Sequence, residues 1–142
     1  MQIKKFKIPI LVFILLSTIA ETGIAADWVK VAQNSEMSTY IDTLSRQRAG
    51  QEVKIWEQYV FTHPQAINDS KATYKVLMML KAYRCDEKTD LILQLSYYTD
   101  ATFNKPFAND SFPDNHSDYK NIKPGSIADF VLKFVCSEAA PK

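Results

Sequence analysis

Apolar and polar residues alternate along much of this chain, and a period of two is typical of β-strands that present two different faces. The alternation is clearest in residues 53–61, where one face is apolar and the other carries Trp56 and Val60. Because both faces are apolar, we expect a central strand or one that is covered on both sides. The same pattern predicts strands at residues 28–31, 38–41, 71–85 and 91–98.

The segment from Lys71 to Cys85 is the longest predicted strand. Its even positions form a continuous apolar face, whereas its odd positions mix apolar residues with lysines. At about 3.3 Å per residue, a strand of this length is expected to bend or to contain a bulge. A helix over residues 74–83 is the alternative, because Leu, Met, Ala and Lys all favour helices. A turn at residues 86–89 makes the segment a hairpin with the strand at 91–98.

Two stretches interrupt the alternation. His63 and Pro64 start a predicted loop that runs through Asn68 and Asp69. Residues 100–118 are rich in proline, asparagine and aspartate, and they predict a long surface loop. Loops of this length often carry function.

The end of the chain predicts a helix over residues 127–135. Ser126 is a suitable N-cap, and Asp129 three residues later completes a pair similar to a capping box. The apolar stripe expected to pack on the sheet has helical spacing and comprises Ile127, Phe130, Val131 and Phe134. Cys136 falls outside this stripe in an ideal helix, so either the last turn unwinds or a bond to Cys136 forms at the sheet edge.

The first residues have the pattern of a signal peptide. Three lysines precede an apolar run at residues 8–19, which is shorter than the roughly 20 residues of a spanning helix. Gly23 and Ala25 supply small residues for cleavage after Ala25. We predict a signal peptide at residues 1–25 and one domain at 26–142, with no membrane span after cleavage. An uncleaved anchor is the alternative.

Export changes the net charge of the chain. The full sequence has 17 Lys and Arg against 16 Asp and Glu. Removing residues 1–25 takes away three lysines and one glutamate, which leaves 14 cations, 15 anions and a net charge of −1. A nearly neutral domain offers no electrostatic basis for binding nucleic acid.

The mature chain holds two cysteines, Cys85 and Cys136. Pairs of cysteines usually form disulfides in the oxidising compartments that exported proteins reach. A bridge here would contribute about 4 kcal/mol by constraining the unfolded chain, and two buried free thiols are the alternative. A structural zinc site needs four Cys or His ligands at close spacing. His63 and His116 lie near neither cysteine in the sequence, so we predict no metal.

Candidate chemistry is sparse. The sequence contains no G-x-S-x-G, H-E-x-x-H or glycine-rich phosphate motif. We therefore predict no catalytic residue, no cofactor and no enzymatic activity. A hydrolase that places His116 beside a serine or an aspartate is the alternative.

The odd positions of residues 71–85 place Lys71, Lys75 and Lys81 in one stripe, with Arg84 nearby. This stripe predicts either a basic face that binds an acidic partner or an exposed strand face that its lysines keep from pairing with other chains.

Several short motifs follow one another in a recognisable order. A Trp-led strand starts at Trp28, Tyr40–Asp42 follows, and a third strand is centred on Trp56. Cys85 ends the long strand, and residues 119–126 lead through Pro-Gly-Ser into a helix that ends in Cys136. Over residues 27–136 the chain resembles the surface-adhesin protein E family of Gram-negative bacteria.

The resemblance implies an α+β fold, in which a C-terminal helix packs on one face of an antiparallel β-sheet and one disulfide joins Cys85 to Cys136. It also implies a non-enzymatic envelope protein, whose namesake binds host matrix and serum proteins. No cysteine follows the signal for lipid attachment, so we expect a periplasmic or secreted protein, with the cell surface as an alternative. The expected partner is a protein, and a homo-oligomer stays open. A periplasmic small-ligand or stress-related protein is the alternative function.

Overall fold

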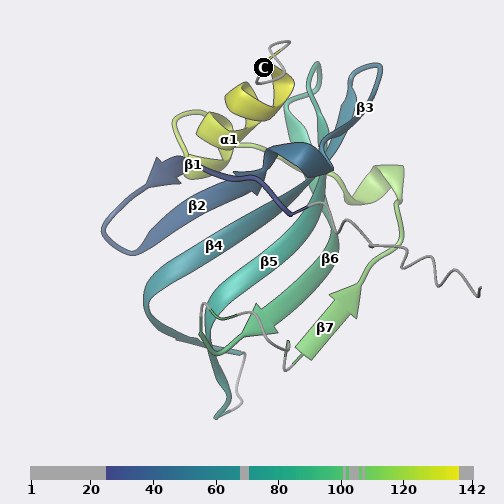
Figure 1. Cartoon of the computed structure of the whole chain (residues 1–142). Coiled ribbons are helices and arrows are strands. Elements are labelled where there is room, and N and C mark those ends of the chain that lie inside the picture. The colour runs from purple at the N-terminus through teal and green to yellow at the C-terminus, as the bar shows by residue number, and fades with distance from the viewer. Residues whose placement is uncertain (1–24, 68–70, 101, 103–105, 107, 138–142) are drawn as a thin grey trace, which may run out of the picture.

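The computed structural model describes residues 25–67, 71–100, 102, 106 and 108–137. Apart from Ala25, the predicted signal peptide lies outside these residues. Among them the strands form one eight-stranded antiparallel sheet, followed by a single α-helix near the C-terminus (Figure 1). The strands are β1 (Trp28–Gln33), β2 (Met37–Asp42), β3 (Gln47–Ala49), β4 (Glu52–Ala66), β5 (Thr73–Arg84), β6 (Thr89–Tyr98), β7 (Ala108–Ser111) and β8 (Lys120–Asn121). The helix is α1 (Ile127–Cys136). The predicted α+β class is confirmed.

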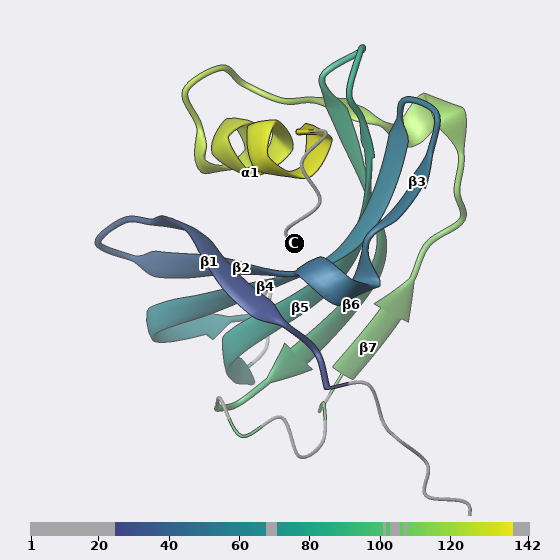
Figure 2. The same ribbon diagram turned by 45° about the horizontal axis from the view of Figure 1, so that its top comes forward.

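The sheet is a meander in the order β1-β2-β4-β5-β6-β7, with β3 paired to β4 and β8 paired to β6. Helix α1 contacts β1, β4 and β5, and it lies across one face of the curved sheet (Figure 2). We call this the helix-side face, and it carries Ile41, Val53, Ile55 and Tyr83. The opposite face, which carries Trp56 and Leu80, is the outer face.

Strands β4 and β5 are the longest, at 15 and 12 residues. The predicted strand at 71–85 is confirmed, and the alternative helix over 74–83 is wrong. Strand β4 also extends through His63 and Pro64 to Ala66, where a loop was predicted. The register shifts between Val60 and Gln65, so Pro64 occupies a bulge where its missing N–H breaks no ladder. Asn68 and Asp69 lie outside the described residues.

The predicted loop at residues 100–118 contains a strand. Strand β7 pairs with the end of β6, opposite residues 94–97. Its sequence, Ala-Asn-Asp-Ser, has no apolar alternation, so hydrophobic pattern could not reveal it. Backbone hydrogen bonds to an existing strand hold this edge in place instead.

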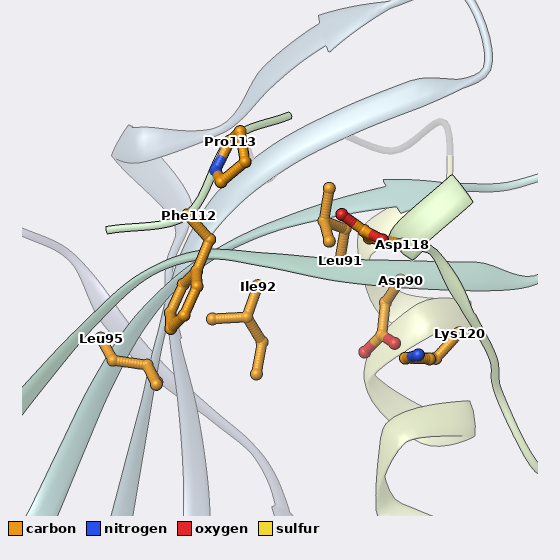
Figure 3. Close-up of a pocket in the computed structure, with 8 residues that line it drawn as sticks. All are labelled: Asp90, Leu91, Ile92, Leu95, Phe112, Pro113, Asp118 and Lys120. Carbon is orange, nitrogen blue, oxygen red and sulfur yellow. The ribbon is translucent and has the colours of Figure 1, made fainter. Parts of the chain in front are cut away.

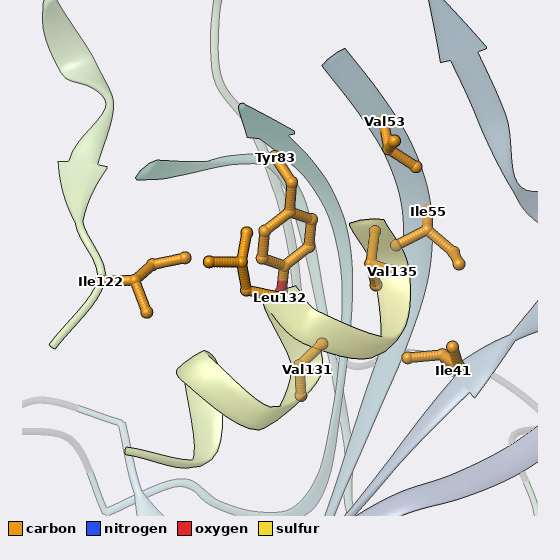
Figure 4. Packing of buried hydrophobic residues seen from close by; sticks show 8 residues of the cluster. All are labelled: Ile41, Val53, Ile55, Tyr83, Ile122, Val131, Leu132 and Val135. Atoms are coloured by element: carbon orange, nitrogen blue, oxygen red, sulfur yellow. The ribbon is translucent and has the colours of Figure 1, made fainter. Parts of the chain in front are cut away.

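The hydrophobic core lies between α1 and the helix-side face (Figure 4). Helix α1 buries Val131, Leu132 and Val135 there. The predicted stripe is partly wrong, because Phe130 and Phe134 are 56% and 40% exposed. Two overlapping stripes have helical spacing in this sequence, and the structure buries the one that carries Leu132 and, four residues later, Cys136.

The disulfide explains this choice of helix face. Cys85 directly follows β5 and bonds Cys136 in the last turn of α1, with the two Cα atoms 5.6 Å apart. The predicted Cys85–Cys136 bridge is confirmed. Because Leu132 and Cys136 lie one turn apart, a helix anchored through Cys136 turns Leu132 toward the sheet and Phe130 away from it.

Polar contacts hold both ends of α1. Ser126 Oγ accepts a hydrogen bond from the Asp129 backbone N–H at 3.2 Å, which confirms the predicted N-cap. Asp129 Oδ2 in turn accepts from the backbone N–H of Gly125 at 2.9 Å. At the other end Arg46 donates to the carbonyl oxygens of Val135 and Ser137, at 2.7 and 2.6 Å. These bonds satisfy backbone groups that the end of a helix otherwise leaves unpaired.

The orientation of α1 predicts a contrast between two neighbouring positions. Val131→Ala should lower the free energy of unfolding by about 2 kcal/mol, because it leaves a cavity in the core. Phe130→Ala should change it by less than about 0.5 kcal/mol, because the ring is exposed. Urea unfolding of both variants measures the difference, and equal losses would show that Phe130 also packs on the sheet.

The disulfide gives a second prediction. Cys85→Ser should lower the free energy of unfolding by about 2–4 kcal/mol, because the 51-residue loop is no longer closed in the unfolded chain. Thermal unfolding of the variant measures this loss, and reduced wild-type protein should match it. A wild-type protein that is equally stable oxidised and reduced would contradict the structural role of the bridge.

Candidate functional site

A cluster of charged side chains lies inside the molecule, on the helix-side face of three adjacent strands. Glu57 comes from β4, Lys81 from β5 and Asp90 from β6. In the strand register Ile55 lies opposite Lys81, and Tyr83 lies opposite Asp90. Directly opposed residues in a sheet share a face, so the cluster occupies the same face as the core under α1.

The Lys81 ammonium lies beside both carboxylates. Lys81 Nζ forms an ion pair with Asp90 and lies 4.0 Å from Glu57 Oε2. The Tyr83 hydroxyl donates a hydrogen bond to Glu57 Oε1. The exposed fractions of the Glu57, Lys81 and Asp90 side chains are 0%, 6% and 16%. Burying a charge is costly unless it is paired, and here one ammonium lies between two carboxylates.

Burial sets the protonation of this cluster. Loss of water raises the pKa of Glu57, although Lys81 and the hydroxyl of Tyr83 oppose the shift. For Lys81, burial lowers the pKa, but the negative charge of Glu57 and the other acidic groups outweighs it and holds the pKa above its usual value. Lys81 therefore stays a buried ammonium, and the carboxyl groups of Glu57 and Asp90 both lie beside this one cation.

A cavity of about 410 Å³ lies at the outer edge of β6, in the interval between β7 and β8 (Figure 3). Most of its wall is apolar, and Phe112 is 45% exposed. The lining residues are Asp90, Leu91, Ile92, Leu95, Phe112, Pro113, Asp118 and Lys120. Asp90 belongs to both the cavity and the buried cluster, so it connects the two.

Polar contacts on the outer face hold the segment that forms the far wall of the cavity. The guanidinium of Arg84 stacks on the ring of Tyr119, 3.8 Å from its centre, and also contacts His116. The Tyr119 hydroxyl donates to Glu52 at 3.2 Å. Lys54 forms an ion pair with Asp114 at 2.7 Å. These contacts tie residues 114–119 to the start of β4 and the end of β5.

The predicted basic stripe is not one surface. Lys71 and Lys75 are exposed, but Lys81 points inward to Glu57 and Asp90. Arg84 lies on the outer face and pairs with Glu52 and Glu87. The expectation of an exposed face was wrong at Lys81 because α1 packs on the face of β5 that carries the lysine.

The ring of His116 lies against Arg84 and Tyr119, and these are the contacts that the described residues make with it. Within the described ranges, no three His, Cys, Asp or Glu side chains gather into a metal site. No helix in that part of the chain is long and apolar enough to cross a membrane.

Sequence reasoning missed Glu57 and Asp90. A usable signal existed at Glu57, which interrupts the apolar face formed by Val53, Ile55 and Tyr59. A charge at such a position needs a buried partner, and the apolar face of a neighbouring strand that carries a lysine could supply it. The pairing with Asp90 required the strand register, which the pattern does not specify.

Comparison with known proteins identifies one family. The family model of surface-adhesin protein E matches residues 28–137, which span the sheet, the cavity and the helix. No curated protein matches the sequence.

The buried glutamate predicts a pH-dependent stability difference. Because burial raises the pKa of Glu57, the folded protein keeps its proton at pH values where the unfolded chain has lost it, from about 4.5 upward. Stability contributed by this group therefore falls as pH rises through that window. Glu57→Gln keeps an acceptor for Tyr83 and removes the titration, so its free energy of unfolding relative to wild type should increase between pH 4.5 and pH 8.

Urea unfolding at several pH values measures this trend. Glu57→Ala is the comparison variant, and it should be less stable than Glu57→Gln by about 1–3 kcal/mol because the buried Tyr83 hydroxyl loses its acceptor. A difference between Glu57→Gln and wild type that stays constant with pH would contradict the raised pKa.

Proposed function

Because the chain belongs to the surface-adhesin protein E family, we propose that it is an exported, non-enzymatic binding protein of the bacterial envelope that binds a protein of the host or the envelope. The binding surface in this proposal is the cavity beside β6. Family membership supports the binding role. The open apolar cavity is the single observation that supports the position of the binding surface.

The lining of the cavity suits a protein partner. Interface hot spots combine large side chains with pockets that exclude water, and aromatic residues are enriched among them. Phe112 provides an exposed ring next to the cavity, and Ile92 and Leu95 provide its apolar floor. Asp118 and Lys120 lie at its polar side, where they can orient a partner by hydrogen bonds or ion pairs.

The rest of the fold keeps this wall in place. The stacked pair Arg84–Tyr119 and the ion pair Lys54–Asp114 hold residues 114–119 against the sheet. A binding surface that is already formed costs less entropy on association than one that must order first. The periplasmic or secreted location stays a prediction from the signal sequence.

A small ligand is the second candidate. The cavity volume of about 410 Å³ falls within the roughly 300–1,000 Å³ that ligand sites occupy. An apolar compound that copurifies with the protein and is seen by native mass spectrometry would favour this function over protein binding.

The proposal predicts that Phe112→Ser weakens binding of the mature protein to its partner by about tenfold or more. Biolayer interferometry against immobilised extracellular-matrix and serum proteins measures the change. Phe130→Ser is the matched control, because Phe130 is also an exposed aromatic ring but lies on α1 and does not line the cavity.

The control should bind as wild type does. If both variants lose affinity equally, the cavity is not the binding surface. If wild-type protein shows no saturable binding to any of these proteins and cells without it adhere normally, the adhesin proposal fails.

A further inference from the structure

We propose that Lys81 and Asp90 condense in the folded protein to form an intramolecular amide bond, with Glu57 carrying the proton. The site would be a covalent cross-link between β5 and β6. This proposal goes beyond the binding function and does not rest on it.

The two reacting groups are held together by the fold. Lys81 Nζ and the Asp90 carboxylate are already in contact on neighbouring antiparallel strands. Lys81 lies opposite Ile92, and Asp90 lies opposite Tyr83, so the pair is a diagonal one across the β5–β6 ladder. Holding two groups in contact replaces a collision in solution by a step within one molecule, which accelerates bond formation greatly.

The surroundings favour an amide over the separated ions. The Lys81 and Asp90 side chains are only 6% and 16% exposed, and the ring of Tyr83 lies 5.1 Å from Lys81 Nζ. The ion pair is the resting state of Lys81 and Asp90, and transfer of one proton from Lys81 Nζ to the Asp90 carboxylate gives the reactive amine and the neutral acid from which the amide forms. An amide carries no charge and is better suited to such a site.

Glu57 is placed to move the proton. Its Oε1 is held by the Tyr83 hydroxyl, and its Oε2 lies 4.0 Å from Lys81 Nζ. Burial raises the pKa of this carboxyl group, so it can take up a proton without leaving the cluster. Tyr83 acts as a positioning residue for Glu57.

The step balances without any added reagent. The step starts from the Glu57 carboxylate. The lone pair of the neutral Lys81 Nζ forms a bond to Asp90 Cγ, and Glu57 Oε2 accepts a proton from the nitrogen. The C–O bond to the Asp90 hydroxyl then breaks, and the hydroxyl takes the proton from Glu57 and leaves as water. Overall, one ammonium and one carboxylate give one amide and one water molecule, and Glu57 returns to its starting state.

The water has a route out of the site. Asp90 lines the cavity at the β6 edge, so the leaving oxygen faces an opening while Lys81 and Glu57 stay buried. Loss of this water to solvent, with little water returning to the buried bond, would hold the reaction on the amide side. The cross-link would join β5 to β6 beside the disulfide that joins Cys85 to α1.

Intact mass spectrometry of the reduced, purified mature protein tests the proposal directly. We expect a mass about 18 Da below that of the sequence, which is one water molecule. Tryptic digestion should yield one branched peptide that joins residues 76–84 to residues 89–120, because the cross-link also blocks cleavage after Lys81. Tandem mass spectrometry locates the bond at Lys81 and Asp90.

Four variants separate this bond from other losses of water. Lys81→Arg and Asp90→Ala should keep the full mass. Asp90→Asn should reach the same final mass as wild type, because its amide loses ammonia, about 17 Da, instead of water. Glu57→Gln should form the bond at least about tenfold more slowly, as expected when a proton carrier is removed.

Two results would overturn the proposal. One is a folded wild-type protein that keeps the full mass of its sequence after prolonged incubation. The other is a loss of water that persists in Lys81→Arg, which would place the dehydration elsewhere in the chain. Both readouts are independent of partner binding, so a failure of the adhesin proposal leaves this test unaffected.

Discussion

The contact between α1 and the helix-side face determines which side chains of the sheet are buried. Val131, Leu132 and Val135 pack against Val53, Ile55 and Tyr83, and the bond from Cys85 to Cys136 holds the helix at that end of the sheet. This packing chooses which face of β5 is inside. The inner face carries Lys81, so the domain must neutralise a buried ammonium within its own core.

The side chains that neutralise Lys81 come from the strands on both sides of β5. Glu57 from β4 and Asp90 from β6 surround Lys81, and Tyr83 orients Glu57. Removing any one partner would leave a charge or a hydroxyl buried without its complement, which makes the cluster a constraint on strand register as well as a chemical site. Replacing the ion pair by an amide would relieve the same cost by covalent means, since an amide needs only hydrogen bonds.

The cavity is a consequence of how the chain closes the β6 edge. Strand β7 covers one end of β6 and β8 covers the other. Between them the Phe112 backbone N–H donates to the Leu93 carbonyl oxygen at 2.8 Å, and residues 113–119 leave the sheet. A sheet edge with few backbone partners invites association with another chain. In this fold Phe112 and Pro113 form a wall over the interval, and the stacked pair of Arg84 and Tyr119 holds the segment that follows them, which leaves an open and mostly apolar cavity at this edge.

Much of the fold follows from the sequence alone, because alternation, capping and the number of cysteines are local or compositional signals. They identified the core of β4, the length of β5, the Ser126 cap and the Cys85–Cys136 pair. Tertiary structure decided the rest. Two helical stripes overlap around Val131, and only the disulfide and the sheet select the one with Leu132. Strand β7 has no apolar pattern because backbone pairing alone holds it. Lys81 looks solvent-exposed by residue type, and its burial depends on partners from β4 and β6, whose register no local pattern encodes.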